Sequence, residues 1–318
     1  MKALLIVFVN LYFITVSYAS EDIILAKAHQ LKSVILDEQR SFSVYLPPNY
    51  NENPDKEYPV IYLLDGDQTQ LKAVAGLVEA LSTERLEQQI QQAIIVAIPN
   101  SKNTIRERDF TPTNVDWTFN GKLLERFENI GNAANYSAFF EKELIPLINK
   151  NYRTSTKRVL IGESFGGLFA NYVLLTNHAL FTDYLIIDAT YLWDNNYLNR
   201  YFDKKQFVNK QLNGNVYFTF ANNGEAFGEI GKTNYQWGLA FVEKLKAHSS
   251  DNLNINQRYF EDETHGTVAA LSWYYGLKSI LKSRAGPRGR QAALIPDHRS
   301  PVHPRAGPFR HRLSASKQ

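Results

Sequence analysis

Residues 159–175 read VLIGESFGGLFANYVLL and join three features in one stretch. The apolar residues at its start are typical of a buried strand, and the eight residues LFANYVLL at its end are typical of a buried helix. Between them, GESFG at residues 162–166 fits the pattern G-x-S-x-G, in which a serine occupies a tight turn from strand to helix. This context predicts that Ser164 is a nucleophile. A phosphate-binding loop is disfavoured, because no Lys-Ser or Lys-Thr pair follows the glycines.

Strands and helices alternate on both sides of this turn. Hydrophobic patterning predicts strands at residues 41–46, 59–64, 93–98, 158–161, 184–187, 216–221 and 254–260. It predicts helices at residues 71–92, 136–149 (with Pro146 bending or ending it), 168–176, 237–247 and 268–281. Two strands, PVIYLL and AIIVAI, are apolar throughout, as in strands that are buried on both faces of a parallel sheet. The pattern indicates one α/β domain with a mostly parallel central sheet flanked by helices.

A serine nucleophile needs a base, and His265 occupies the position that suits one. It follows the predicted strand 254–260 and a short acidic loop, beyond the carboxyl end of a strand in an open sheet. His29 comes too early for the expected chain order of serine, acid and histidine. His178 and His248 lie at the ends of predicted helices, and the other three histidines lie in the C-terminal tail without metal-ligand spacing.

The third member of such a triad is a carboxylate that orients the histidine and stabilises its protonated form. The strand before that of His265, residues 216–221, is followed by Asn-Asn-Gly-Glu at residues 222–225. Glu225 is the first carboxylate after this strand, so chain order predicts Glu225 as the acid. The open alternatives are Glu229, four residues further on, Asp188 after an earlier strand, and Asp194.

Acyl transfer also needs two amide donors for the oxyanion. We expect one from the backbone of Phe165 and the other from Gly66 or Asp67, in the loop after strand 59–64. Asp65 and Asp67 are too few ligands for a metal, so no metal site is expected. Candidate residues for an acyl or aryl pocket are aromatic, with plain packing as the alternative for each: Trp117, Phe119, Tyr191 and Trp193.

The composition is globular and excludes several chemistries. The chain has 318 residues, 44% apolar and 21% charged, and no cysteine, which excludes disulfides, thiolate metal sites and a cysteine nucleophile. The formal net charge of +3 is uneven: residues 284–318 hold seven arginines, one lysine and one aspartate, a net charge of +7, which leaves about −4 for the rest. The global charge therefore does not indicate a nucleic-acid partner.

Both ends of the chain are expected to lie outside the α/β domain. Residues 1–19 have an early Lys2, a short apolar stretch and small residues before Ser20, which predicts a cleaved signal peptide and an exported protein, periplasmic or secreted. The apolar stretch is too short for a stable membrane span. Residues 284–318 hold five of the twelve prolines and lack a periodic apolar face, which predicts a disordered tail. The esterase-like α/β domain would then be residues 20–283.

Six blocks, in this order, resemble the “Putative esterase” family of α/β hydrolases, which includes enterochelin and related siderophore esterases, S-formylglutathione hydrolases, feruloyl esterases and mycolyltransferases. The blocks are VYLPPNY (44–50), YPVIYLLDGD (58–67), IPNSKNTIRERDFTP (98–112), GESFGG (162–167), DATYLWDN (188–195) and FEDETHG (260–266). The resemblance is strongest to the enterochelin-esterase-like branch. It implies the α/β-hydrolase fold, catalytic Ser164 and His265, and an acid near Glu225. The chain departs from the family at residues 188–191, Asp-Ala-Thr-Tyr, where a Ser-Pro-Ser-like stretch is expected.

Together these observations predict a serine esterase that acts on a small-molecule ester without a cofactor. Ser164 would attack the ester carbonyl, His265 would accept its proton, and water would then cleave the acyl-enzyme. The expected substrates are a siderophore trilactone or a short-chain or aryl ester. The alternatives are acyl transfer to an alcohol and a catalytically silent binding protein, against which the intact Ser164 and His265 argue.

The signal peptide yields a direct prediction. When the full chain is produced in a Gram-negative host, the mature protein should begin at Ser20, because cleavage is expected after the small residue Ala19. N-terminal sequencing of the purified protein measures this. Recovery of a chain that starts at Met1 in the membrane fraction would favour an uncleaved anchor instead.

Overall fold

The computed structural model describes residues 24–83, 87–100, 103–203 and 212–283. The predicted signal peptide and the predicted tail, residues 1–19 and 284–318, lie outside the described residues. Within the described ranges, no helix has the length and apolar character needed to cross a bilayer.

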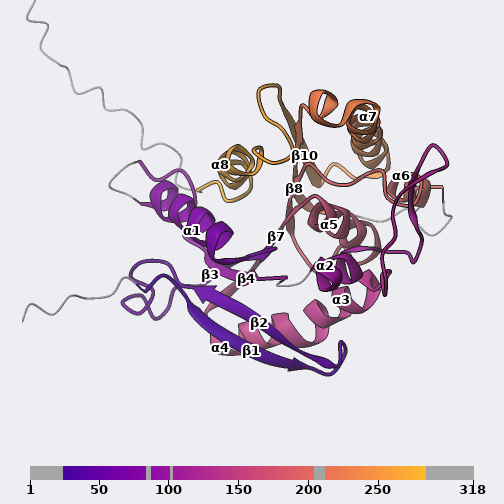
Figure 1. The fold of residues 1–318 in the computed structure, drawn as a ribbon. Helices are drawn as coiled ribbons and strands as arrows, with labels where there is room; N and C mark the ends of the chain where they lie inside the picture. Colours follow the sequence, from indigo (N-terminus) through magenta and orange to yellow (C-terminus); the bar gives the residue numbers. More distant parts are fainter. Residues whose placement is uncertain (1–23, 84–86, 101–102, 204–211, 284–318) are drawn as a thin grey trace, which may run out of the picture. The chain divides into compact units, whose positions relative to one another are not determined.

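A single large sheet forms the centre of the fold, as Figure 1 shows. Its eight strands follow the order β1-β2-β4-β3-β7-β8-β9-β10. Their bounds are β1 Lys27–Ser33, β2 Glu38–Tyr45, β3 Tyr58–Leu64, β4 Ile94–Ile98, β7 Thr154–Glu163, β8 Asp183–Ile187, β9 Gly214–Ala221 and β10 Leu253–Phe260. The pairs β1–β2 and β2–β4 are antiparallel, and all other neighbours are parallel. The predicted mostly parallel sheet is therefore confirmed, and the carboxyl ends of its six parallel strands share one edge.

Helices cover both faces of this sheet (Figure 1). One face carries α1 (Gln68–Ser82) and α8 (Ala269–Ile280). The other carries α2 (Asn103–Phe110), α3 (Ala133–Phe139), α4 (Ile145–Asn151), α5 (Phe165–Thr176), α6 (Tyr197–Tyr201) and α7 (Gly224–His248). The result is the three-layer arrangement that a parallel sheet needs in order to bury both of its faces.

Alternation along the strands divides the core into two clusters. In β3, Val60, Tyr62 and Leu64 pack on the face of α3 and α5, whereas Ile61 and Leu63 pack on the face of α1 and α8. Successive side chains of a strand point to opposite faces, so a strand that is covered on both sides is apolar at every position. This explains why PVIYLL reads as a continuous apolar run rather than an alternating one.

Two of the predicted helices have different limits in the structure. The helix expected at residues 71–92 ends at Ser82, and Ile90 instead forms an isolated bridge with Lys282. The helix expected at residues 136–149 is interrupted by a π-helical turn, Phe140–Leu144, directly before α4. Pro146 lies in the first turn of α4, where its missing N–H is tolerated, and the wider turn before it accommodates its ring.

The start of α7 differs most from the sequence-based expectation. This helix was predicted at residues 237–247, but it begins at Gly224, three residues after β9 ends. Gly228 interrupts it with φ 55° and ψ −129°, a backbone conformation that favours glycine. Glycines are poor helix formers, so the sequence around them is more typical of a loop.

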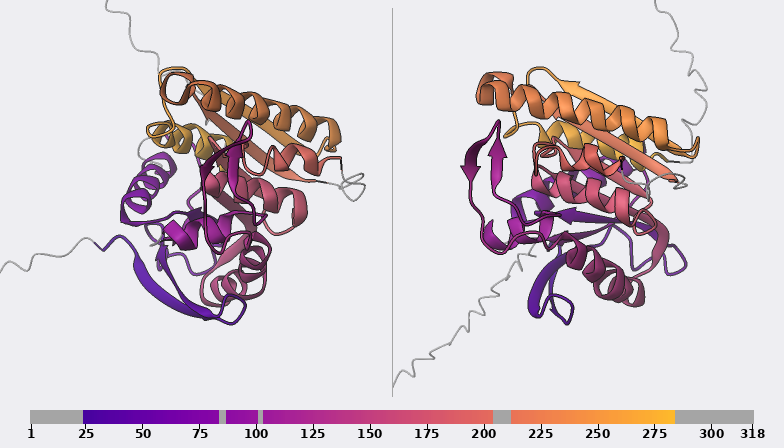
Figure 2. Two further views of the ribbon diagram at one scale, coloured as in Figure 1. Left: turned by 45° about the vertical axis from the view of Figure 1, so that its right-hand side comes forward. Right: turned by 90° about the vertical axis from the view of Figure 1, so that its right-hand side faces the viewer.

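Four further features were not predicted. They are the polar edge strand β1, helix α2, the short helix α6, and a separate antiparallel hairpin formed by β5 (Trp117–Phe119) and β6 (Lys122–Glu125). Figure 2 shows this hairpin standing out from the layered core. It is too short and too exposed to give a recognisable alternating pattern, although it brings Trp117 to the candidate site.

Candidate active site

Ser164 lies on the sharp turn between β7 and α5. Its backbone has φ 57° and ψ −119°, a left-handed conformation that is unfavourable for a residue with a side chain. Two hydrogen bonds hold it there: its N–H donates to the carbonyl of Ile187 (3.0 Å), and its own carbonyl accepts from Thr190 (3.1 Å). The predicted strand–turn–helix context of Ser164 is thus present, and neighbouring backbone maintains the strained turn.

The glycines of this turn differ in their importance. A Cβ on Gly162 would lie 2.2 Å from the carbonyl oxygen of Gly166, so no side chain fits there. A Cβ on Gly167 would lie 2.7 Å from the Cβ of Ala189, which explains how closely α5 approaches the segment after β8. At Gly166 the nearest atoms would be 3.6 Å away, an ordinary contact. The turn therefore depends on Gly162 and Gly167 rather than on the second glycine of the pattern.

His265 pairs with Asp188. The Nδ1 atom of His265 lies 2.6 Å from Oδ2 of Asp188, which directly follows β8 and is only 3% exposed. Two further donors satisfy the same carboxylate, the backbone N–H of Ala221 (3.2 Å) and Nδ2 of Asn223 (2.7 Å). Three donors thus converge on one buried carboxylate, which satisfies its hydrogen-bonding capacity and holds it beside the histidine.

The structure corrects the prediction that Glu225 is the carboxylate beside His265. Glu225 lies in the first turn of α7 and is exposed, and Glu229 is exposed as well. Because α7 begins directly after the β9 turn, its first acidic residues face solvent instead of reaching the histidine. Asp194 forms an ion pair with Arg200 (3.2 Å). Of the four carboxylates considered, Asp188 is the one that contacts His265.

The electrostatic surroundings favour a protonated His265. Its hydrogen bond to Asp188 is the main cause that raises the pKa of His265 above its ordinary value, and the charge of Glu163 adds to this, while burial and Arg106 oppose it. Burial raises the pKa of Glu163 itself, although His265 and Arg106 partly offset the rise. The histidine is thus prepared to hold a proton taken from a nearby hydroxyl.

Arg106 fixes the base of the loop that follows β3. Its Nε atom donates to both carboxylate oxygens of Asp65 (3.0 and 2.9 Å), and its guanidinium lies 5.6 Å from the ring centre of Phe165. It also donates to the carbonyl of Glu163 (3.4 Å). Arg106 therefore ties this loop to the serine turn.

The three backbone amides expected to stabilise an oxyanion differ in whether their N–H groups already have a hydrogen-bond partner. Phe165 is the first residue of α5, where a helix offers its N–H no partner of its own, so its amide stays a candidate donor. The N–H of Gly66 donates to Ile98 (3.0 Å), and that of Asp67 donates to Asp65 (2.8 Å). These two amides are engaged in the structure, which does not support them as free donors. The side chain of Asp67 caps α1 through the N–H of Thr69 and Gln70 (2.7 and 3.2 Å).

Ser164, Asp188 and His265 all line one cavity of about 140 Å³. Its other walls are mostly apolar: Trp117, Leu192, Phe227, Ile230 and Gly231, with the polar Thr190, Asn223 and Asn234. Of the residues predicted to form a pocket, Trp117 lies in this lining. Tyr191 and Trp193 are 1% and 0% exposed, belong to the core and do not line this cavity, unlike the prediction.

Three polar residues of this cavity were missed in the sequence. The hydroxyl of Thr190 lies 3.5 Å from Oγ of Ser164. Asn234, from α7, accepts from the backbone of Tyr191 and Leu192 and donates to Ala189, and so fixes the segment after β8. Asn223 contacts Asp188. No local motif marks these residues: Thr190 is placed by the contact of its segment with the serine turn, and Asn223 and Asn234 by where α7 begins.

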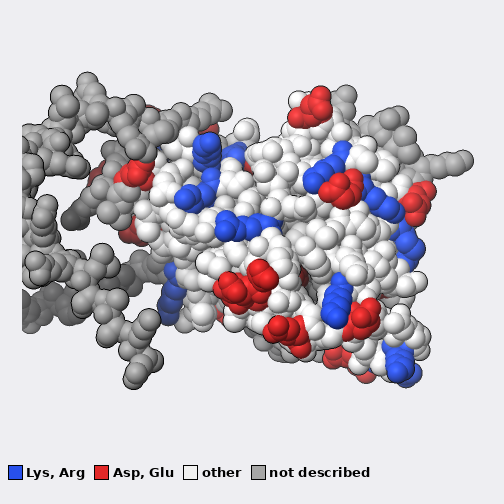
Figure 3. Space-filling view, turned by 90° about the horizontal axis from the view of Figure 1, so that it is seen from above, with Lys and Arg blue, Asp and Glu red and all other residues white. Residues whose placement is uncertain are grey.

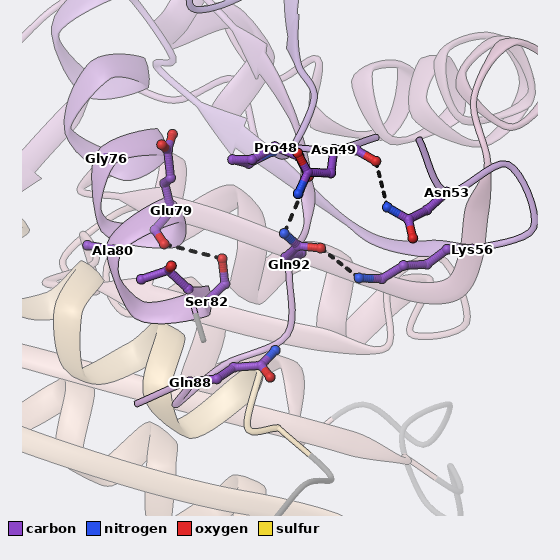
Figure 4. Close-up of a pocket in the computed structure, with 11 residues that line it drawn as sticks. Pro48, Asn49, Asn53, Lys56, Gly76, Glu79, Ala80, Ser82, Gln88 and Gln92 are labelled. Carbon is purple, nitrogen blue, oxygen red and sulfur yellow. Dashed lines mark hydrogen bonds between the residues drawn. The ribbon is translucent and has the colours of Figure 1, made fainter. Parts of the chain in front are cut away.

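A larger cleft of about 970 Å³ lies elsewhere, beside α1 (Figure 4). Its polar side chains bond mainly among themselves and to backbone, as in the contact of Lys56 with Gln92 (2.6 Å). The hydroxyl of Ser82 in its lining donates to the backbone carbonyl of Glu79 (3.4 Å) rather than to a basic side chain. Among the residues that the structure describes, no group of three or more histidine, aspartate or glutamate side chains could hold a metal ion. The small cavity is therefore the candidate active site.

Comparisons with known proteins identify the family of the chain. The model of the family described as “Putative esterase” matches residues 33–269. Ferri-bacillibactin esterase BesA of Bacillus subtilis (strain 168) is 29% identical over 249 residues, which are 74% of this chain and 75% of that protein. The chain belongs to the “Putative esterase” family and is a carboxylic ester hydrolase.

Solved structures show the same fold. An IroE-like serine hydrolase from Shewanella oneidensis is 33% identical with a TM-score of 0.69, and the match covers 80% of each chain. The BES protein from Bacillus cereus is 24% identical with a TM-score of 0.69, covering 83% of this chain and 99% of that one. The predicted α/β-hydrolase fold is thereby confirmed.

The serine turn allows a matched test with two glycines. Gly162→Ala should destabilise the protein by about 1–3 kcal/mol or more and remove most esterase activity, because the new Cβ collides with backbone across the turn. Gly166→Ala, whose Cβ meets only ordinary contacts, should fold with nearly unchanged stability and keep activity. Denaturant unfolding and hydrolysis of a p-nitrophenyl ester measure both effects. Equal behaviour of the two variants would contradict this account of the turn.

Proposed function

We propose that the protein hydrolyses esters through a triad of Ser164, His265 and Asp188, and that its substrates are siderophore esters. The observation that carries the proposal is the 2.6 Å contact between His265 and the buried Asp188, in a cavity that Ser164 also lines. A nucleophile, a base and a buried acid that converge on one cavity are the arrangement that acyl transfer requires.

In the proposed mechanism, the Oγ atom of Ser164 attacks the ester carbonyl while His265 accepts the serine proton through Nε2. The carboxylate of Asp188 accepts a hydrogen bond from Nδ1–H of His265, which fixes the tautomer and stabilises the imidazolium. His265 then gives its proton to the departing alcohol, leaving an acyl group on Ser164. Water attacks the acyl-enzyme with His265 as base, and the acid product leaves as the serine regains its proton. The Phe165 amide is the proposed oxyanion donor.

The size and walls of the cavity favour a compact apolar group next to Ser164. A volume of about 140 Å³ is close to that of a cavity that accommodates one benzene ring. Trp117 and Phe227 offer aromatic faces for such a group. On the face shown in Figure 3, acidic and basic side chains lie in small separate groups among uncharged ones. In the part of that face that the structure describes, recognition of a charged ligand would thus rely on individual side chains.

The name of one relative supports siderophores as the substrate class, because it is a ferri-bacillibactin esterase. The IroE-like relative is named as a serine hydrolase, which supports the proposed serine chemistry. A siderophore with an ester-linked backbone could place one ester bond at Ser164 while the rest of the molecule stays outside the small cavity. The predicted signal peptide adds the proposal that this hydrolysis takes place after export from the cytoplasm.

Three substitutions test the triad. Ser164→Ala should lower kcat by about 10⁴-fold or more, and Asp188→Asn by about 10²–10⁴-fold with little change in KM, because the amide no longer holds the required histidine tautomer. Glu225→Gln is the matched control and should leave kcat near the wild-type value, since Glu225 is exposed in the first turn of α7. Kinetics with a p-nitrophenyl ester decide between these carboxylates. A collapse of kcat in Glu225→Gln, with Asp188→Asn nearly unaffected, would refute the proposed acid.

The substrate class calls for a separate assay. The purified protein, incubated with a catecholate trilactone siderophore in iron-free and ferric form, should open the ring and yield a product heavier by one water. Liquid chromatography with mass spectrometry follows this, with Ser164→Ala as the inactive control. We expect a higher kcat/KM for the trilactone than for p-nitrophenyl acetate. Hydrolysis of simple esters without any ring opening would leave the esterase assignment intact but exclude this substrate class.

A further inference from the structure

Asn223 occupies an unusual place beside the proposed triad. It is the second residue after β9 and stands at the N-cap position of α7, where it is only 6% exposed. Its Nδ2 atom donates to Oδ2 of Asp188 (2.7 Å), and its Oδ1 atom accepts from the backbone N–H of His265 (2.8 Å). One side chain thus bonds both to the carboxylate and to the residue that carries the imidazole.

The orientation of this amide follows from its partners. A carboxylate can only accept, and a backbone N–H can only donate, so the amide nitrogen must face Asp188 and the amide oxygen must face His265. Exchanging the two atoms would place acceptor against acceptor and donor against donor. The bridge therefore exists in only one orientation of the Asn223 amide.

The side chain of Asn223 does not cap α7, as an asparagine at the N-cap position usually does. At an N-cap, the side-chain oxygen normally accepts from an N–H in the first turn of the helix. The Asn223 side chain makes no such bond to α7, and instead its oxygen accepts from His265. At the start of α7, Asn223 contributes only through its backbone, because its carbonyl accepts a hydrogen bond from the N–H of Phe227 (2.9 Å). The side chain is thus committed to the site rather than to the helix.

The backbone of Asn223 is held tightly. A Cβ on Gly231 would lie 2.2 Å from the carbonyl oxygen of Asn223, so this turn of α7 packs directly on it. The N–H of Asn223 donates to Ala221 (3.0 Å), and the neighbouring Asn222 donates to Glu263 (2.8 Å), in the loop that carries His265. A side chain on such a fixed backbone can hold its partners in one geometry.

We propose that Asn223 is a positioning residue, which fixes Asp188 and His265 relative to each other and keeps the carboxylate aimed at Nδ1. This inference rests on the proposed triad. His265 and Asn223 both donate to Oδ2 of Asp188, and the backbone N–H of Ala221 donates to Oδ1. With both oxygens held, the carboxylate cannot rotate away when the imidazole becomes charged. The same amide anchors the histidine loop at the correct distance.

The first test is a double-mutant cycle. Asn223→Ala should lower kcat by about 10–100-fold with little change in KM, because a hydrogen bond to a charged group is lost. If Asn223 acts through Asp188, the same substitution should cost much less in the Asp188→Asn background. Asn222→Ala is the matched control: it changes a neighbouring asparagine, keeps the backbone N–H that bonds to Glu263, and should leave kcat nearly unchanged.

The second test uses Asn223→Asp, which keeps the shape of the side chain but replaces its donor by a carboxyl group. The charged groups that act on His265 are Asp188, Glu163 and Arg106. The new carboxyl oxygen would take the place of Nδ2, 2.7 Å from Oδ2 of Asp188, and two carboxylates at that distance hold one proton between them. While that proton is present, the new side chain can donate to Asp188 as the amide does; when it is lost at higher pH, the donor is replaced by a second negative charge. We therefore expect kcat/KM to follow the wild-type pH profile at low pH and to gain a descending limb at high pH that the wild-type protein lacks.

These measurements separate the possible outcomes. An equal loss on Asn223→Ala in both backgrounds, together with a wild-type pH profile in Asn223→Asp, would show that Asn223 only stabilises its turn and would overturn the inference. Circular dichroism and thermal unfolding of each variant identify losses due to misfolding, and Asn223→Asp stays informative if Asn223→Ala fails to fold. Full activity of Ser164→Ala would instead refute the proposed triad, so the two failures are distinguishable.

Discussion

The left-handed backbone of Ser164 is the constraint on which the rest of the site depends. A residue at φ 57° and ψ −119° is stable only where its surroundings hold it in place. Here the N–H and the carbonyl of Ser164 bond to Ile187 and Thr190, which flank Asp188 along the chain. The turn that presents the nucleophile and the turn that presents the acid are therefore one hydrogen-bonded unit. Gly162 and Gly167 permit this close approach, because a side chain at either position would collide with one of the two turns.

The order of the strands explains how the acid and the histidine meet. Asp188 directly follows β8 and His265 follows β10, so β9 lies between their strands in the sheet. The gap is closed from the end of β9: the N–H of Ala221 and the side chain of Asn223 both reach Asp188, and Asn223 also reaches His265. An acid placed after β9 would not need this bridge. Its placement after β8 makes the turn between β9 and α7 part of the site.

Much of this arrangement could be predicted from the sequence. The strand–turn–helix context around Ser164 and the position of His265 after a strand follow from hydrophobic patterning and from a short motif, both of which are local. The acid could not be predicted in the same way. Chain order ranks Glu225 ahead of Asp188, but the ranking assumes a loop after β9. The helix begins at Gly224 because tertiary packing, including the contact of Gly231 with Asn223, outweighs the poor helix propensity of its glycines.

The aromatic residues show the same limit of local reasoning. Trp117, Tyr191 and Trp193 have similar character in the sequence, yet only Trp117 reaches the cavity, because the β5–β6 hairpin carries it there from outside the layered core. Tyr191 and Trp193 follow a buried strand and continue into the core. Phe227 reaches the cavity from the first turn of α7, just before the interruption at Gly228, and its ring lies edge-on to His265 at 6.4 Å.

The β5–β6 hairpin and the start of α7 therefore have a different role from the central sheet. Strands β7, β8 and β10 position the proposed triad, and their geometry is fixed by packing on both faces. The hairpin and the start of α7 form the apolar walls, and both have exposed side chains, such as Leu123 and Phe227 at 48% and 52%. Substitutions in these walls can change the shape of the cavity without disturbing the core. We therefore propose that the sheet positions the catalytic groups of this hydrolase, whereas the hairpin and the first turns of α7 shape the cavity that receives the ester.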